Sequence, residues 1–283
     1  MFWKKWISTS PDGEISPSLN QLRAVALSDV GCVRTNNEDA TRFIRPATRE
    51  VQLQKGYLAI VADGMGGHAA GEVASQMATE IVAKTYYQRE ESPEDSLYFA
   101  LAKANRLIWQ TAGRNTRQKG MGTTCTTVVI RDAQLFVAHV GDSRAYLYKN
   151  GQFVRLTTDH TYVQKLVEEG VISPADAETH PERNVLTRAM GTHNKVEIDV
   201  EKPAYLFEDG DRLLLCSDGL YDYLTDDEMA EFLNLEMVSE AAQQMIDLAR
   251  QRGGHDNITV MIVERIEPDE SAEIRPTETL DLL

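Results

Sequence analysis

The sequence has few cysteines, a deficit of basic residues and no long apolar run. Its three cysteines are widely spaced and form no C-x-x-C pair, so the sequence predicts neither a disulfide framework nor a zinc site. No stretch approaches the roughly 20 apolar residues that a membrane-spanning helix requires. The net charge is -15, from 29 basic and 44 acidic residues. This charge disfavours binding to nucleic acid or to an anionic lipid surface, and stable membrane insertion is not expected.

Both ends of the chain differ in composition from its centre. Residues 1–20 are rich in serine and proline and predict a flexible leader, and residues 267–283 predict an acidic flexible tail. The first residues are aromatic and basic but turn polar at Ser8, which is not typical of a secretory signal. With no apolar span and no disulfide pattern, a cytoplasmic location is favoured. No linker interrupts residues 21–266, which are expected to form one domain of a monomer.

Hydrophobic patterns predict a mixture of strands and helices. Apolar residues at helical spacing indicate helices at 72–86, 93–110 and 239–250, with short helical pieces at 162–169 and 174–177. A further helix pair is expected within 226–251. Runs rich in β-branched and apolar residues indicate strands at 22–27, 56–62, 123–130, 135–140, 144–148, 212–216 and 258–263.

Five aspartates lie at the edges of apolar or strand-like runs: Asp39, Asp63, Asp142, Asp218 and Asp256. Three of them follow the C-terminal end of a strand, whereas Asp39 and Asp256 precede one. If all five carboxylates meet, the two groups of strands must run in opposite directions. The sequence therefore predicts a largely antiparallel arrangement with helices on the outer faces, and it disfavours a doubly wound parallel sheet.

Converging carboxylates are the ligands that magnesium and manganese prefer. Two such ions held about 3.5–4 Å apart can activate a hydroxide and polarise a phosphoryl group, and Asp63 is the ligand we expect to bridge them. Gly64 follows it, and a residue without Cβ lets its carbonyl approach an ion. We expect the glycine-rich run 64–67 to form a tight turn that enters a helix at about His68 or Gly71.

Arg34 lies five residues before Asp39. Its planar guanidinium matches two phosphate oxygens at once, which is typical of a substrate-binding arginine. A surface salt bridge is the alternative interpretation.

Seven stretches, in order along residues 22–265, together resemble one family. The chain is similar to bacterial members of the PPM (PP2C-like) metal-dependent serine/threonine protein phosphatases. The matching stretches are 28–39, 61–68, 121–124, 140–144, 156–160, 216–220 and 254–259. The resemblance implies an α+β fold in which two packed antiparallel β-sheets form a sandwich flanked by α-helices (αββα).

The resemblance also implies a set of metal ligands for two core Mn²⁺ or Mg²⁺ ions and a looser third ion. Asp63 would bridge the core pair and the carbonyl of Gly64 would bind one of its ions. Asp218 and Asp256 would complete the core pair, with Asp39 at it or next to it. Asp142 matches the position that, with Asp218, holds the third ion.

Other positions carry roles in binding and proton transfer. Arg34 matches the arginine that binds the substrate phosphate, and Glu38 is a candidate to support the ligands. Animal members carry a histidine directly after the Asp-Gly pair, whereas this chain has Met65, whose thioether cannot donate a proton. His68 or metal-bound water could serve as general acid instead, while a helix-capping or surface role for His68 is equally open.

The implied activity is hydrolysis of phosphoserine and phosphothreonine by direct attack of a metal-bridging hydroxide, which reverses serine/threonine kinase signalling. The implied partners are phosphorylated proteins and a cognate kinase with its substrates. Residues 161–194 resemble the family's flap beside the active site, although a plain surface excursion is an alternative.

Two other functions compete with this interpretation. A pseudophosphatase would bind phosphoproteins with little turnover, but every core carboxylate is present. A serine esterase with Ser143 of the run Gly141–Ser143 as nucleophile would leave four aspartates without a role.

Overall fold

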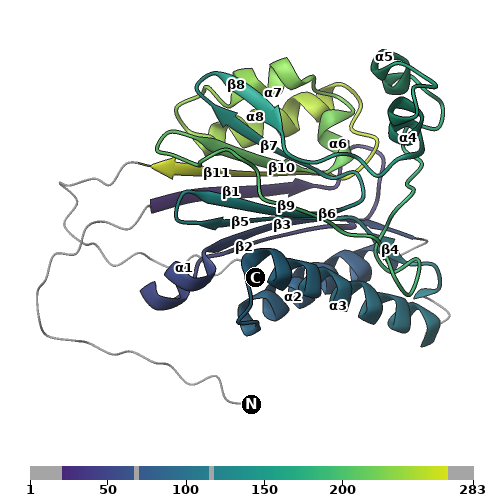
Figure 1. The fold of residues 1–283 in the computed structure, drawn as a ribbon. Helices are drawn as coiled ribbons and strands as arrows, with labels where there is room; N and C mark the ends of the chain where they lie inside the picture. The colour runs from purple at the N-terminus through teal and green to yellow at the C-terminus, as the bar shows by residue number, and fades with distance from the viewer. Residues whose placement is uncertain (1–20, 67–69, 115–117, 267–283) are drawn as a thin grey trace, which may run out of the picture.

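The computed structural model of the chain describes residues 21–66, 70–114 and 118–266. The predicted leader (1–20), the predicted tail (267–283) and His68 lie outside these residues. Figure 1 shows two sheets packed face to face between two layers of helices. This arrangement confirms the predicted αββα sandwich.

All strand pairs are antiparallel, as the positions of the aspartates predicted. The first sheet has the order β1 (Gln21–Asp29), β11 (Ile258–Ile266), β10 (Arg212–Cys216), β7 (Arg144–Lys149) and β8 (Gln152–Arg155). The second has the order β2 (Asp39–Ile44), β3 (Tyr57–Met65), β5 (Cys125–Arg131), β6 (Gln134–Val140) and β9 (Asp199–Glu201). A short strand, β4 (Gly122–Thr123), pairs with the end of β3.

Helices cover the outer face of each sheet (Figure 1). The long helices α2 (Ala70–Gln88) and α3 (Pro93–Arg114) pack on the second sheet, and α1 (Arg49–Lys55) connects β2 to β3. The helices on the first sheet are α6 (Asp218–Tyr221), α7 (Asp226–Phe232) and α8 (Val238–Gln251). The short helices α4 (Tyr162–Glu168) and α5 (Pro174–Glu178) stand at the end of the sandwich near α6 and β4. Among the described helices, none is long and apolar enough to cross a membrane.

The central strands are buried on both faces, which explains why their sequences are apolar throughout. On β3, Leu58, Ile60 and Ala62 belong to the cluster under α2 and α3. The alternate residues Tyr57, Ala59 and Val61 belong to the cluster between the two sheets. The strand ends therefore emerge from a rigid core, which fixes the positions of the aspartates that follow or precede them.

The structure corrects two local predictions beside Asp63. Gly64 and Met65 do not form a turn, because β3 continues through both and pairs with Thr123 and Gly122 of β4. The strand expected at 123–130 is interrupted at Thr124, whose amide donates to the Asp63 carbonyl (2.8 Å) and whose hydroxyl accepts from the Asp63 amide (2.8 Å). Both corrections arise from tertiary pairing with the Asp63 region, which outweighs the local preference of Gly64 for a turn and interrupts the strand at Thr124.

Candidate metal centre

The five predicted aspartates come from strand ends that the sandwich brings together. Asp39 and Asp63 are directly opposite each other on the antiparallel pair β2 and β3. Asp218 opens α6 directly after β10, and Asp256 precedes β11, the antiparallel neighbour of β10. Asp142 lies in the turn between β6 and β7, so it connects the two sheets at the same end of the sandwich.

The electrostatics of Asp63 show that the aspartates form one cluster. Burial raises its pKa well above the usual value for aspartate, and the negative charges of Asp39, Asp218, Asp142 and Asp256 raise it further. The pKa of Asp218 is raised in the same way, first by burial and then by neighbouring carboxylates. Such a cluster is unfavourable at neutral pH unless positive charge is supplied.

Asp39 is anchored by two hydroxyl groups that the sequence reasoning did not single out. Its Oδ2 accepts hydrogen bonds from Ser217 Oγ (2.7 Å) and Thr259 Oγ1 (2.6 Å). Burial nevertheless raises the pKa of Asp39 to about 6. Sequence reasoning could have found Ser217 and Thr259, because both lie within the matching stretches. Ser217 is next to the predicted ligand Asp218, and Thr259 is close to the predicted ligand Asp256.

Two carboxylate oxygens in the cluster are buried without a partner. Within the described part of the chain, Asp39 Oδ1 and Asp218 Oδ1 have no hydrogen-bond partner. Unpaired buried carboxylate oxygens are costly, and they are the ligands that a hard divalent cation takes. As the side chains stand, no three Asp, Glu, His or Cys groups among the described residues enclose a single ion position. The donor chemistry and the unpartnered oxygens nevertheless fit Mn²⁺ or Mg²⁺.

Gly64 lies where three segments approach each other too closely for a side chain. A Cβ at this position would lie 2.2 Å from the Gly71 carbonyl oxygen and 2.5 Å from the Glu38 carbonyl oxygen. The Gly64 amide donates to the same Glu38 carbonyl (3.1 Å). Glu38 itself is half-buried, and burial raises its pKa. The close contact of Gly64 with Gly71 and Glu38 holds β3 against the start of α2 and against the segment that carries Asp39.

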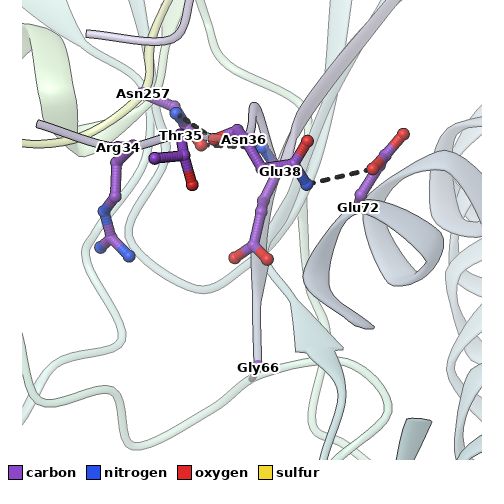
Figure 2. A pocket seen from close by; sticks show the side chains of 7 residues that line it. All are labelled: Arg34, Thr35, Asn36, Glu38, Gly66, Glu72 and Asn257. Carbon is purple, nitrogen blue, oxygen red and sulfur yellow. Dashed lines mark hydrogen bonds between the residues drawn. The ribbon is translucent and has the colours of Figure 1, made fainter. Parts of the chain in front are cut away.

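A pocket of about 400 Å³ opens beside the cluster (Figure 2). It is lined by Arg34, Thr35, Asn36, Glu38, Gly66, Glu72 and Asn257. Asn257 holds the loop on one side of the pocket, because its Nδ2 donates to the carbonyls of Val30 and Asn36 (both 3.0 Å). Its Oδ1 accepts from the Glu38 amide (2.8 Å). Sequence reasoning missed this role, although Asn257 is adjacent to Asp256.

Arg34 lies in the pocket and forms an ion pair with Asp256. The Arg34 Nη2 atom lies 2.6 Å from Asp256 Oδ2, and both side chains are half-exposed. This hydrogen bond is the largest of the causes that raise the pKa of Arg34. The pair brings the predicted phosphate-binding group into direct contact with a predicted metal ligand.

Burial has a measurable consequence for Asp142. Burial, and then the charge of Asp159, raise the pKa of Asp142 to about 7, well above the usual range for aspartate. A carboxyl whose folded-state pKa is raised destabilises the fold when it is ionised, and this cost disappears once it is protonated in both states. In chelator, Asp142→Asn should therefore unfold at a higher temperature than the wild type above pH 7, and the difference should vanish as the pH falls towards 4. Thermal melts across this range check the prediction, and a pH-independent difference would contradict it.

Two antiparallel sheets between helices, with aspartates gathered at one end beside an arginine-bearing pocket, define the class of metal-dependent phosphatases. The family described as "Protein phosphatase 2C" matches residues 34–259, and the chain belongs to this family. The membership predicted from seven short stretches is thus confirmed.

Named relatives and solved structures agree with the family assignment. The chain is 38% identical over 252 residues to the serine/threonine protein phosphatase PstP of Mycobacterium tuberculosis, covering 88% of this chain and 46% of that protein. It is 38% identical to the serine/threonine phosphatase stp of Listeria innocua, covering 86% of this chain and 96% of that protein. The solved catalytic domain of PstP in complex with two manganese ions superposes with a TM-score of 0.72 at 36% identity, covering 87% of this chain and 99% of that one. The chain thus spans about half of the mycobacterial protein and nearly all of the Listeria protein.

Proposed function

We propose that the protein hydrolyses phosphoserine and phosphothreonine in phosphorylated proteins at the aspartate cluster, with Mn²⁺ or Mg²⁺ as cofactor. The observation that carries the proposal is the pair of unpartnered buried oxygens of Asp39 and Asp218 beside Asp63 and the Arg34 pocket. The two manganese ions of the related PstP structure support it.

The core ions would be held by the side chains of Asp63, Asp39, Asp218 and Asp256 and by the carbonyl of Gly64. A third ion would be held by Asp142 and Asp218. When bound, such ions supply an activated water as nucleophile and polarise the phosphoryl group. The thiols of Cys125 and Cys216 are buried, and burial raises the pKa of both, so neither is suited to act as a nucleophile.

The chain's own residues bind and orient the phosphoryl group. Arg34 would exchange its bond with Asp256 for two phosphate oxygens, and it would stabilise the charge that develops on them. Asn257 fixes the loop that carries Arg34, so the guanidinium is presented at a defined position. Glu38, whose backbone is held by the same Asn257, would support the ligands from the pocket side.

Proton donation to the departing seryl or threonyl oxygen is assigned to His68 or to water. Met65 cannot supply the proton, and it lies at the end of β3 next to Gly122. His68 therefore stays a prediction.

The finer parts of the proposal concern partners and organisation. We infer a cognate serine/threonine kinase whose phosphorylated substrates this enzyme returns to the unmodified state, a cytoplasmic location and a monomeric protein. Residues 21–266 would be the phosphatase domain, and residues 161–194 would be a flap that influences which phosphoprotein binds. The relatives named serine/threonine phosphatases support the substrate class.

Phosphate release from a phosphothreonine peptide tests the function directly. The full chain should release phosphate with Mn²⁺, lose this activity when the metal is chelated, and regain it when Mn²⁺ is returned in excess. A chelator-resistant activity would contradict the metal-dependent mechanism. Binding of the phosphopeptide without release of phosphate, at any Mn²⁺ concentration, would instead identify a pseudophosphatase.

A further inference from the structure

Between β8 and β9 the chain forms an excursion, residues 161–187, that leaves the sandwich and returns to it at one point. The Tyr162 amide donates to the Val185 carbonyl, and the Thr187 amide donates to the His160 carbonyl, both at 2.8 Å. Thr161 and Leu186 form an antiparallel bridge between these bonds. The segment 161–187, which carries α4 and α5, therefore has a closed base, and the residues before that base determine its position.

His160, directly before the base, is buried and binds the turn that precedes Asp142. Its backbone amide donates to the Gly141 carbonyl (2.7 Å), and its Nδ1 accepts from the Gly141 amide (3.1 Å). With Nδ1 as acceptor, the ring proton is on Nε2, which donates to Asp199 Oδ2 at 3.0 Å. Gly141 has a φ of 111° and lies so close to Thr124 that a Cβ there would be 2.6 Å from the Thr124 side chain, so only glycine fits at this position. His160 thus holds both polar backbone groups of the residue next to Asp142.

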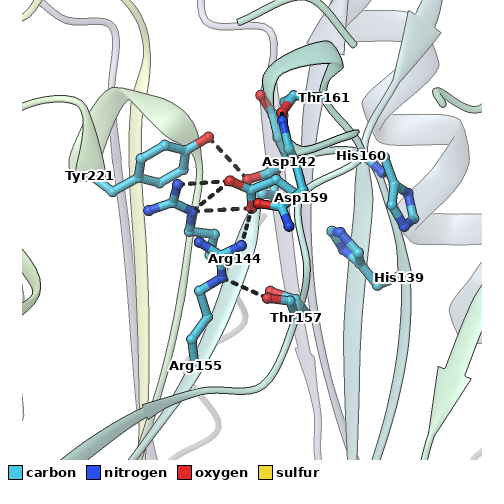
Figure 3. A network of polar contacts seen from close by, with 12 residues as sticks. His139, Asp142, Arg144, Arg155, Thr157, Asp159, His160, Thr161 and Tyr221 are labelled. Atoms are coloured by element: carbon cyan, nitrogen blue, oxygen red, sulfur yellow. Dashed lines mark hydrogen bonds and ion pairs between the residues drawn. The ribbon is translucent and has the colours of Figure 1, made fainter. Parts of the chain in front are cut away.

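Asp159, the residue before His160, is bound on the opposite side of the chain (Figure 3). Its carboxylate receives the Arg144 guanidinium, with Nη2 to Oδ2 at 2.7 Å and Nε to Oδ1 at 3.1 Å. The same guanidinium lies over the Tyr221 ring, 3.5 Å from its centroid. The Tyr221 hydroxyl donates to the Asp142 carbonyl (3.1 Å). Tyr221 ends the short helix that Asp218 begins, so Asp159 is connected to both aspartates.

The outer contacts of the excursion are weaker than these. Arg183 Nη2 and Asn184 Nδ2 lie 3.3 and 3.2 Å from Asp222 Oδ2. The Arg183 side chain is half-exposed, and ion pairs of this kind contribute little to stability. The buried contacts of Asp159 and His160 are charge-assisted or geometrically fixed, so they set the position of the base.

We propose that Asp159 and His160 form a positioning pair that holds the base of segment 161–187 to the segments carrying Asp142 and Asp218. The inference rests on the proposed function, in which Asp142 and Asp218 are metal ligands. Neither member of the pair contacts the pocket. They act by keeping the excursion and the two aspartates in one fixed arrangement, so that a displacement of the excursion displaces the ligands.

Two substitutions of His160 test its side-chain hydrogen bonds to Gly141 and to Asp199 separately. Asparagine can place an acceptor where Nδ1 lies, which keeps the bond to Gly141, whereas glutamine reaches the position of Nε2 and keeps only the bond to Asp199. His160→Gln should lower kcat on a phosphothreonine peptide by about 10- to 100-fold, the range for residues that orient metal ligands, with KM little changed because the Arg34 pocket is intact. His160→Asn should recover most of kcat. Asp247→Asn, at an exposed residue of α8, is the control and should match the wild type.

Hydrogen exchange and metal titration give readouts that need no turnover. With Mn²⁺ present, His160→Gln should exchange faster than the wild type both in 140–144 and in 161–187, and calorimetry should show weaker binding of the loosest Mn²⁺. Faster exchange in 161–187 alone, with 140–144 and the Mn²⁺ isotherm unchanged, would overturn the proposal. If the wild type is inactive but His160→Gln still speeds exchange in both 140–144 and 161–187, the proposed function is contradicted and the coupling between these two segments is not.

If His160→Gln does not fold, Asp159→Asn is the second variant, because it retains the shape of the side chain while removing the charge that faces Arg144. Faster exchange in 140–144, 161–187 and 218–221 together supports the pair. A change confined to one of these segments contradicts it.

Discussion

Asp63→Asn should lower kcat/KM on a phosphothreonine peptide by about three orders of magnitude or more. Metal ions at a phosphoryl group are worth several kcal/mol of transition-state stabilisation, and about 4 kcal/mol corresponds to a factor of roughly 10³. Asp63 is the ligand whose pKa is raised by all four other aspartates, so it lies at the centre of the cluster. Phosphate release at saturating Mn²⁺, for the wild type and the variant, checks the prediction.

The same substitution should stabilise the protein when metal is chelated. Because the pKa of Asp63 is raised above the unfolded-state value, its ionised form destabilises the fold at neutral pH, and asparagine removes that charge. Each kcal/mol gained corresponds to about 2–4 °C in Tm for a domain of this size. Mn²⁺ should then raise the Tm of the wild type more than that of the variant, because ligands stabilise the state that binds them.

An exposed aspartate provides the matched control. Asp247→Asn on α8 makes the same chemical change far from the cluster, at an exposed side chain that accepts from Gln243 (3.0 Å). It should leave both activity and the Mn²⁺-dependent Tm unchanged. An Asp63→Asn enzyme within tenfold of the wild type would remove Asp63 from the metal centre.

The antiparallel arrangement could be predicted from the positions of the aspartates relative to the apolar runs, whereas the αββα sandwich was implied by the resemblance to the phosphatase family. Asp63 lies near the C-terminal end of β3 and Asp218 follows β10, whereas Asp256 precedes β11, and only an antiparallel arrangement brings such residues to one end. Both faces of β3 and β10 are buried, so their continuous apolar sequences identify them without any alternation. The positions of these two strands could therefore be predicted from local sequence alone.

The supporting contacts could not be predicted, because they join residues that are far apart in the chain. Thr259 reaches Asp39 across 220 positions, and Asn257 reaches Val30 across 227. Threonine and asparagine are common at strand ends for local reasons, so their types indicate no partner. The continuation of β3 through Gly64 could not be predicted for the same reason. Its partner strand, β4, lies far along the chain at Gly122–Thr123, and glycine by itself favours a turn.

Gly64→Ala should reduce kcat/KM by about a hundredfold although it removes no carboxylate. The added Cβ would meet the Gly71 and Glu38 carbonyl oxygens at 2.2 and 2.5 Å, and both are backbone atoms that cannot rotate away. To relieve the overlap, β3 must move from α2 or from the segment that carries Asp39. A displacement of about 1 Å at a reacting centre can cost roughly 10² in rate. Overpacking should also lower stability by about 1–3 kcal/mol.

Gly113→Ala is the matched control for this substitution. A Cβ at Gly113 in α3 meets no atom within 4 Å, so the variant should keep full activity and gain up to about 1 kcal/mol of helix stability. Steady-state kinetics, Mn²⁺ titration and thermal melts of both variants distinguish the causes. A Gly64→Ala protein with weakened Mn²⁺ binding and a modest fall in Tm would show that the close approach at Gly64 sets the metal ligands. Wild-type kinetics in that variant would mean that the ligands tolerate the displacement, and that the position of β3 does not limit the reaction.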